Sequence, residues 1–306
     1  MGEEMKRRIL SEEEIEQFKK DFYTVETGAL SKKYGLRPHS LYYLGKKLGL
    51  SRLDFNRKYM SDKSRKYSVD ESYFSKIDNH EKAYFLGLMY ADGYVQEKKN
   101  MASLALSECD IDTVRALKDA MSFDGPIHIY KGKRSNRSPR CVISFSSKRI
   151  ASSLAAQGCV GRKTFKIRFP FFLDDALYPS FVRGYFDGDG SVFVCKRTIK
   201  ARGKKYTASD YGVGITSNSD FVHDLHGLLV EMFGRTGIAV AIDKRKVGIS
   251  NINIRGKAIF AFMDWIYSHD GTRMERKHAL YSRLKQARET GLQGEDLVLF
   301  CKGEDR

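Results

Sequence analysis

The sequence lacks any long apolar run and any organised set of cysteines. None of its segments approaches the ~20 uninterrupted apolar residues that span a bilayer, and its N-terminal MGEEMKRRIL is not followed by an apolar region. The five cysteines include no Cys-x-x-Cys pair, which argues against both a disulfide framework and a zinc site. We therefore expect a soluble, cytoplasmic protein with reduced cysteines.

Charge is strongly unbalanced toward the positive sign. Lysine and arginine number 54 against 38 aspartates and glutamates, which gives a net charge of +16. Such a field favours a polyanionic partner, and nucleic acid is the first candidate. A basic protein without such a partner is the alternative.

The first 60 residues predict short helices. In SEEEIEQFKKDFY, Ile15, Phe18 and Phe22 share one helical face behind a serine cap, and the following segment reads as two helices joined by a glycine turn. This layout is typical of a helix-turn-helix, so we predict a DNA-binding domain over residues 1–60 and a linker over 61–79. A helical bundle with solvated lysines is the alternative. The predicted contacts are Arg37, His39, Ser40, Tyr42, Tyr43, Lys46 and Lys47.

From residue 80 onward the chain repeats one order of parts. The first copy opens on AYFLGLMYADGYV and the second on SFVRGYFDGDGSV, and each continues with a strand, Ser-x-x-Asp, an amphipathic helix, a hairpin and a further helix. Each copy therefore predicts an α+β unit of order αββαββα with a four-stranded antiparallel sheet. We assign 80–172 to the first unit, 173–290 to the second, pseudo-symmetric unit, and 291–306 to a C-terminal tail.

The opening segment of each copy predicts a buried helix with a glycine inside it. Gly87 and Gly184 stand five residues before Asp92 and Asp189, and a mid-helix glycine costs about 1 kcal/mol relative to alanine, which close contact between helices would justify. The aspartates fall at the helix C-termini, where the macrodipole disfavours a carboxylate unless a cation binds. Two helices packed at their glycines would bring the aspartates together around a divalent metal.

The glycine after each aspartate is predicted to be a left-handed helix cap; these are Gly93 and Gly190. A single Asp-Gly turn would mean little, but there are two. The DGDGS stretch also resembles the start of an EF-hand loop. That loop requires glutamate at position twelve, where Thr198 stands, and glycine at position six, where Val192 stands. The sequence therefore does not predict a calcium-binding loop here.

The segments FLGLMYADG (85–93) and VRGYFDGDG (182–190) resemble the two signature helices of the LAGLIDADG homing endonucleases in their single-chain form. The resemblance covers residues 80 to about 285 and implies a monomer with saddle-shaped antiparallel sheets in the DNA major groove. It implies that Asp92 and Asp189 bind metal and carry catalysis. The family's earlier acid corresponds to Tyr90 in the first motif and Asp187 in the second, which makes the halves unequal.

The resemblance also implies Mg²⁺ as the cofactor, with Mn²⁺ as a substitute and Ca²⁺ as a cation that binds without supporting cleavage. The backbone carbonyls of Ala91 and Gly188 would complete the coordination. Family members place a basic residue beside each metal site, and Lys163 in GRKTF and Lys277 in MERKH are the candidates.

Basic residues concentrate in the predicted hairpin turns, and runs of one sign are typical of phosphate contacts. In NINIR, Ile252 and Ile254 are predicted to face inward, which turns outward the amides and guanidinium that pair with adenine and guanine. A solvated polar face is the alternative. The predicted contacts are Lys131, Lys133, Arg134, Arg137, Arg140, Lys196, Arg197, Lys200, Arg202, Lys204, Lys205, Lys244, Arg245, Lys246, Asn251, Asn253 and Arg255.

The sequence thus predicts a site-specific double-strand DNA endonuclease with a long, asymmetric target, either free-standing or intron-encoded. An intein is disfavoured, because the chain has no N-terminal cysteine or serine and no terminal His-Asn. A transcription regulator of the same fold and an RNA maturase that assists intron splicing remain alternatives. Asp92 and Asp189 favour the enzyme over the regulator, since a pure binder gains nothing from two carboxylates that face phosphate.

Overall fold

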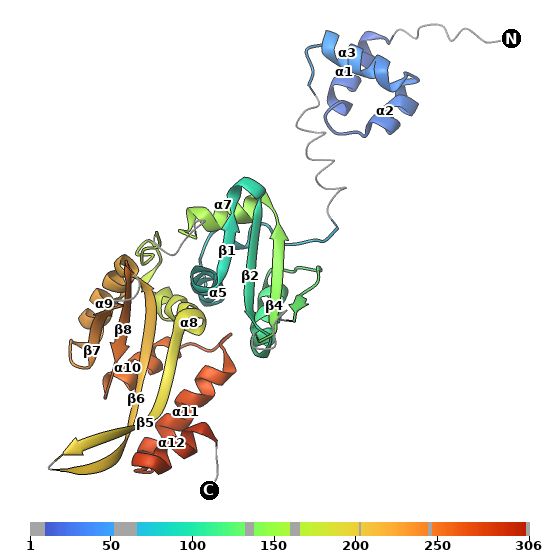
Figure 1. Ribbon diagram of the computed structural model, residues 1–306. Helices are drawn as coiled ribbons and strands as arrows, with labels where there is room; N and C mark the ends of the chain where they lie inside the picture. The colour runs from blue at the N-terminus through green and yellow to red at the C-terminus, as the bar shows by residue number, and fades with distance from the viewer. Residues whose placement is uncertain are drawn as a thin grey trace. The chain divides into compact units, whose positions relative to one another are not determined.

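The computed structural model describes residues 10–51, 66–131, 138–159, 166–201, 203–243 and 247–303. The chain divides into two compact units, Met1–Tyr67 and Ser68–Arg306 (Figure 1). Within the described ranges, no helix has both the length and the apolar character needed to cross a membrane.

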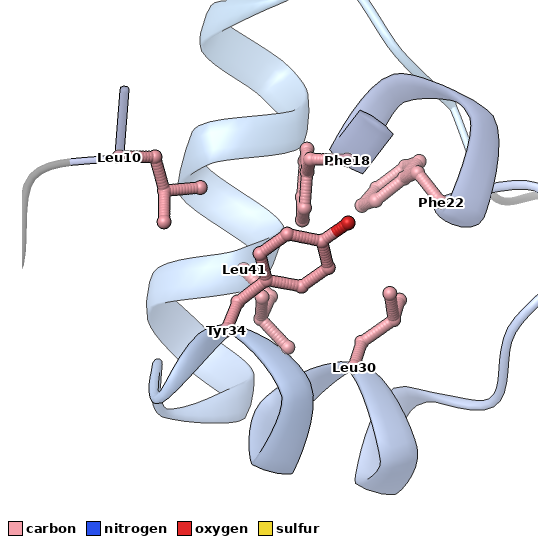
Figure 2. Packing of buried hydrophobic residues seen from close by; sticks show 6 residues of the cluster. All are labelled: Leu10, Phe18, Phe22, Leu30, Tyr34 and Leu41. Atoms are coloured by element: carbon pink, nitrogen blue, oxygen red, sulfur yellow. The ribbon is translucent and has the colours of Figure 1, made fainter. Parts of the chain in front are cut away.

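The first unit is a cluster of helices. These are α1 (Glu12–Asp21), α2 (Thr27–Tyr34) and α3 (Pro38–Lys47). Ser11 and Glu14 form a capping box at the start of α1, as the sequence indicates. Gly35 ends α2 in the left-handed conformation and makes the predicted turn into α3. Figure 2 shows the apolar core between the helices, formed by Leu10, Phe18, Phe22, Leu30, Tyr34 and Leu41.

A buried carboxylate ties the first two helices together. Asp21 accepts hydrogen bonds from Lys33 at 2.5 Å and from the Tyr34 hydroxyl at 2.7 Å, both on α2, and from Gln17 on its own helix. The Lys33 bond, followed by that of Tyr34, lowers the pKa of Asp21 to about 2.

The second unit contains both predicted copies. The first is α5 (His80–Ala91), β1 (Gly93–Gln96), β2 (Met101–Ser107), α6 (Ile111–Ala120), β3 (His128–Tyr130), β4 (Arg140–Ser146) and α7 (Lys148–Ala156). The second is α8 (Tyr178–Asp189), β5 (Gly190–Ala201), β6 (Lys204–Asn218), α9 (Ser219–Phe233), β7 (Ile238–Ile242), β8 (Ile249–Ile254) and α10 (Ala258–Ile266). The αββαββα order predicted for each copy is confirmed.

The two sheets share one topology. Each is antiparallel and four-stranded, in the orders β1-β2-β4-β3 and β5-β6-β8-β7. Their first strands begin directly after α5 and α8, and these two helices lie side by side between the sheets (Figure 1). The α+β architecture with a small N-terminal helical unit is therefore as expected.

Each sheet buries one face and leaves the other open. Along β8, Ile252 and Ile254 are fully buried, whereas Asn251 and Asn253 between them are partly exposed. This is the alternation that the sequence predicts. The cross-strand pairing of Thr216 with Asn251 places both on the open face, and their side chains are hydrogen bonded.

Two predicted boundaries differ from the structure. Residues 68–79, assigned to the linker, belong to the second unit, because Tyr73 and Phe74 in the short 3-10 helix η1 (Tyr73–Ser75) are buried. The C-terminal segment is not a tail. It follows α11 (Glu275–Glu289) and forms α12 (Gly294–Lys302), which packs its apolar residues against α11 and beneath the β5–β6 hairpin.

Candidate active site

The helices α5 and α8 touch through their glycines. A methyl group on Gly87 would lie 2.0 Å from the carbonyl oxygen of Phe181, and one on Gly184 would lie 1.9 Å from the carbonyl oxygen of Tyr84. Because real Cβ atoms do not approach so closely, only glycine allows the backbones to meet here. The structure therefore brings together the two helices that the sequence analysis pairs.

The packing brings the ends of both helices to one place. Asp92 is the C-cap of α5 and is half-buried, while Asp189 is the last residue of α8 and is exposed. A methyl group on Gly188 would lie 2.8 Å from Oδ2 of Asp92 and 2.3 Å from Cβ of Ala91. The Asp92 carboxylate thus lies against the backbone of α8, one residue before Asp189.

The buried phenol of Tyr185 lies within the electrostatic reach of both carboxylates. Burial raises its pKa well above the ordinary value, and Asp189, which is hydrogen bonded to it, and Asp92 raise it further. The Tyr185 hydroxyl oxygen also lies 2.7 Å from Ser217 Oγ. This phenol stays protonated and acts as a neutral donor under the two acids.

The glycines after the aspartates are not left-handed caps, contrary to the prediction. Gly190 is extended, with φ −90° and ψ 163°, and Gly93 begins β1 directly. The chain passes from helix into strand without a turn, so no positive φ is needed. Glycine is required by space instead: a Cβ on Gly190 would lie 2.1 Å from the Phe186 ring, and one on Gly93 would lie 2.5 Å from the carbonyl oxygen of Met89.

The donors at this point suit a hard divalent cation. Asp92 and Asp189 add carboxylate oxygens to two helix C-termini, where carbonyl groups already carry negative partial charge. The described residues contain no group of three or more His, Cys, Asp or Glu side chains placed to hold a metal. The two carboxylates present are as many as Mg²⁺ commonly takes from a protein, beside substrate phosphates and water.

Asp187 is buried beside this pair rather than exposed to solvent. Its Oδ2 accepts from the Tyr84 hydroxyl and from the backbone N–H of Met274, both at 2.8 Å. Burial raises the pKa of Asp187 to about 6 against the effect of these donors. The corresponding residue of the first copy, Tyr90, donates to the carbonyl of Gln157 at 2.6 Å. The predicted inequality of the two halves is therefore structural: each side chain anchors a different segment.

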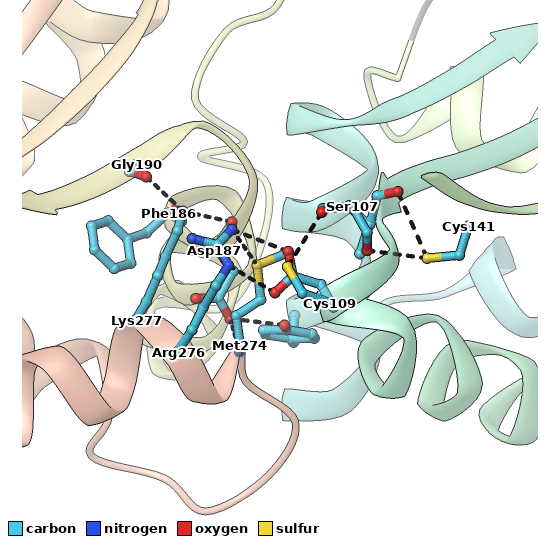
Figure 3. Close-up of polar contacts among 12 residues, drawn as sticks. Ser107, Cys109, Cys141, Phe186, Asp187, Gly190, Met274, Arg276 and Lys277 are labelled. Carbon is cyan, nitrogen blue, oxygen red and sulfur yellow. Dashed lines mark hydrogen bonds and ion pairs between the residues drawn. The ribbon is translucent and has the colours of Figure 1, made fainter. Parts of the chain in front are cut away.

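Lys277 does not project into open solvent as a mobile cation. Its ammonium donates to the carbonyl oxygens of Phe186 at 2.7 Å, Asp187 at 2.6 Å and Gly190 at 2.5 Å (Figure 3). Burial lowers its pKa to about 8, and the charge of Asp187 opposes this effect. Lys277 therefore caps the C-terminus of α8 and holds its last helical turn, which ends at Asp189.

A cleft of about 430 Å³ opens beside Asp92. Its lining includes Ser107 and Arg140 from the first sheet, and Gly188 and Arg276 from the second copy. The guanidinium of Arg276 is bound to Asp110, a residue of the first copy. Neither residue of this pair is predicted from the sequence: Asp110 enters only as the last residue of the first Ser-x-x-Asp motif, and MERKH is noted for Lys277 rather than for Arg276.

The predicted DNA contacts are only partly described. Arg140, on the open face of the first sheet, lines the cleft. Lys131, Arg197 and Lys205 are exposed. Outside the described residues lie Lys133, Arg134, Arg137, Lys163, Arg202, Lys244, Arg245 and Lys246, together with the side chains of Lys200 and Lys204.

Two of these predicted contacts are paired with acids. Lys196 is bound to Glu295 of α12 at 2.5 Å, on the helix-covered side of the hairpin. Arg255 is bound to Asp210 and lies 4.7 Å from the centre of the Phe193 ring, on the open face. Of these two residues, only Arg255 therefore lies where a duplex on the open face would contact it.

In the first unit, α3 presents the predicted residues on its solvent side. Arg37, His39, Ser40, Lys46 and Lys47 are exposed, while Leu41 and Gly45 of the same helix face the core. The rings of His39 and Tyr43 are 4.6 Å apart, and Tyr42 and Tyr43 are 64% and 56% exposed. Aromatic rings and cations thus share one surface.

No protein-family model matches the sequence, and no curated protein matches it. Solved structures do. The meganuclease I-AabMI bound to uncleaved DNA has 14% sequence identity and a TM-score of 0.47 over 74% of this chain and 98% of its own. I-SmaMI bound to its uncleaved DNA target in the presence of calcium ions has 13% identity and a TM-score of 0.45 over 74% and 96%. The I-LtrWI homing endonuclease bound to target DNA has 13% identity and a TM-score of 0.44 over 72% and 92%. The alignments to these three DNA-bound structures, two of them of LAGLIDADG proteins, cover 72 to 74% of this chain.

Proposed function

We propose that this chain is a site-specific DNA endonuclease that acts as a monomer and hydrolyses both strands of a long duplex site. The observation that carries the proposal is the meeting of Asp92 and Asp189 at the ends of two helices joined through glycine. Two carboxylates at helix C-termini repel DNA unless a cation lies between them and the phosphates.

Asp92, Asp189 and the carbonyls of Ala91 and Gly188 would hold Mg²⁺, which when bound neutralises phosphate charge and activates water. The protein's own residues fix this arrangement. Lys277 immobilises the last turn of α8 through three carbonyls, and Gly87 and Gly184 set the separation of the helices. The protein thus positions its oxygen donors before DNA arrives.

The open sheet faces and the excess positive charge would hold the duplex. Ser, Thr and Asn side chains on β6 and β8, with Arg140 and Arg255, present donors and acceptors on the uncovered faces. The net charge of +16 supplies sequence-independent attraction. The exposed side of α3 would add contacts from the first unit.

Selection from a duplex library tests this function. The full chain is incubated with random or genomic duplexes in Mg²⁺, and cut molecules are recovered and sequenced. The proposal expects one long, asymmetric site cut in both strands with Mg²⁺ or Mn²⁺ and bound but uncut with Ca²⁺. Sequence-specific binding without cutting in any of the three would instead support a DNA-binding regulator.

A further inference from the structure

Arg276 reaches from the C-terminal half of the repeat into the first half. It stands at the start of α11 and donates from Nε to Oδ1 of Asp110 at 2.8 Å and from Nη2 to Oδ2 at 3.1 Å. Asp110 lies in the short 3-10 helix η3 (Glu108–Asp110), which precedes α6. Two parallel hydrogen bonds fix the plane of the guanidinium as one bond would not.

Burial differs sharply across this pair. The side chain of Asp110 is 4% exposed, whereas that of Arg276 is 52% exposed. The buried Asp110 carboxylate therefore holds the guanidinium of Arg276 in place, and the exposed part of the guanidinium can bind another partner. Within the part of the chain that the structure describes, the Nη1 amino group of Arg276 donates to no protein acceptor.

The surface that Arg276 presents lines the cleft beside Asp92. The acids of that lining are Asp92, Asp110 and Asp187, and its cations are Arg140 and Arg276. Of the three lining acids, Asp110 and Asp187 are buried and Asp92 is half-buried, so a phosphate in this cleft meets the Asp92 carboxylate, and a fixed cation in the same lining would offset the repulsion. Figure 3 shows Arg276 beside Met274, whose backbone N–H donates to Asp187 of α8.

We infer that Arg276 is a catalytic residue of the proposed nuclease: its Nη1 group contacts the phosphate that is cut at Asp92, and Asp110 positions it. The inference rests on the proposed function. In the hydrolysis, water adds to phosphorus, one P–O ester bond breaks and the leaving oxygen gains a proton. Arg276 transfers no proton. It stabilises the negative charge that grows on the phosphate oxygens, which planar guanidinium donors match in geometry.

The contact belongs to one of the two strands, because the cleft lies at Asp92 and Arg276 has a single copy. The test uses the full chain and its selected duplex, with a different label on each strand. Arg276→Gln is expected to slow cleavage of one strand by about 100-fold, so that nicked duplex accumulates. Asp110→Asn should slow the same strand, and Arg276→Lys should restore part of the rate.

Arg273→Gln is the matched control. Arg273 lies three residues away, pairs with its neighbour Glu275 and carries the same charge, but it does not line the cleft. Its loss should leave both strands within about threefold of the unchanged chain. The fluorescence of Trp265, the single tryptophan, verifies that each variant is folded.

Equal rates on both strands in Arg276→Gln, whether slowed or not, would overturn the inference and leave the proposed function standing. A chain that binds its selected duplex but cuts neither strand would refute the proposed function and, with it, the catalytic role of Arg276. In that chain the salt dependence of binding still tests the phosphate contact: Arg276→Gln should lower the slope of log K against log salt by about 1, and Arg273→Gln should not.

Discussion

The ammonium of Lys277 lies 2.5 Å from the carbonyl oxygen of Gly190, the residue at which α8 ends and β5 begins. The same ammonium also binds the carbonyls of Phe186 and Asp187. The lysine predicted as the basic residue beside the second metal site thus holds the last turn of α8, which ends at Asp189.

Replacing Lys277 with methionine keeps the length of the side chain and removes its donors. Three buried carbonyls then lose their partner, so we expect the second unit to lose about 3 kcal/mol of unfolding free energy. Denaturant titration followed by Trp265 fluorescence measures it. Lys285→Met, at a partly exposed residue bound to Asp264, should cost less than about 1 kcal/mol; equal losses would refute the capping role.

Gly184→Ala tests the contact between the motif helices. The new methyl group would lie 1.9 Å from the carbonyl oxygen of Tyr84, so the helices must separate, at a cost of about 3 kcal/mol or more. Gly227→Ala is the control, because this helical glycine in α9 has no atom within 4 Å of the new methyl. It should gain about 0.5 to 1 kcal/mol. The same fluorescence titration decides, and a stable Gly184→Ala variant would contradict the packing.

Acid should loosen the first unit through Asp21. Its folded pKa is lowered to about 2, so its contribution is complete above the unfolded value of about 3.9 and is lost as pH falls toward 2. This amounts to on the order of 2 kcal/mol. Asp21→Asn should remove this contribution at pH 7 and should make the stability of the first unit less dependent on pH between pH 4 and 2.

Hydrogen exchange of the backbone amides of residues 10–51 measures this change locally, apart from the second unit. Glu13→Gln, at an exposed position of α1, removes the same charge and should change protection by less than about 0.5 kcal/mol. Equal pH profiles for Asp21→Asn and the unchanged chain would show that the carboxylate does not hold α1 to α2.

The exposed side of α3 should contribute phosphate contacts. Substituting both Lys46 and Lys47 with glutamine is expected to lower the slope of log K against log salt by about 2. The same change at Lys19 and Lys20 of α1 removes equal charge from another surface and should have little effect. Binding titrations between low and moderate salt measure both, and equal slopes for the two variants would show that α3 is not a DNA surface.

The fold was largely predictable because its signals are local. The order of elements, the buried glycines and the alternation around Ile252 and Ile254 follow from periodicity and repetition within short windows. The left-handed caps at Gly93 and Gly190 were predicted wrongly. The local sequence is the same whether a glycine after a helix is needed for a positive φ or because no Cβ would fit there.

The rest of the site depends on contacts between distant segments. Arg276 and Asp110 are 166 residues apart, and no periodicity links them. Lys277 meets α8 because α11 folds back beneath it, and α12 is a short helix that buries its apolar face against α11 and the β5–β6 hairpin. Such pairings are set by tertiary packing, which a single sequence does not display.

The account depends most on Asp189. The most direct measurement is the cleavage rate of the selected duplex in Mg²⁺ by Asp189→Asn beside the unchanged chain, with binding measured in Ca²⁺. Loss of a metal-binding carboxylate should reduce cleavage by about 100-fold or more, while binding stays equal or tightens, because one negative charge no longer faces phosphate. Undiminished cleavage by Asp189→Asn would contradict the assignment of the active site.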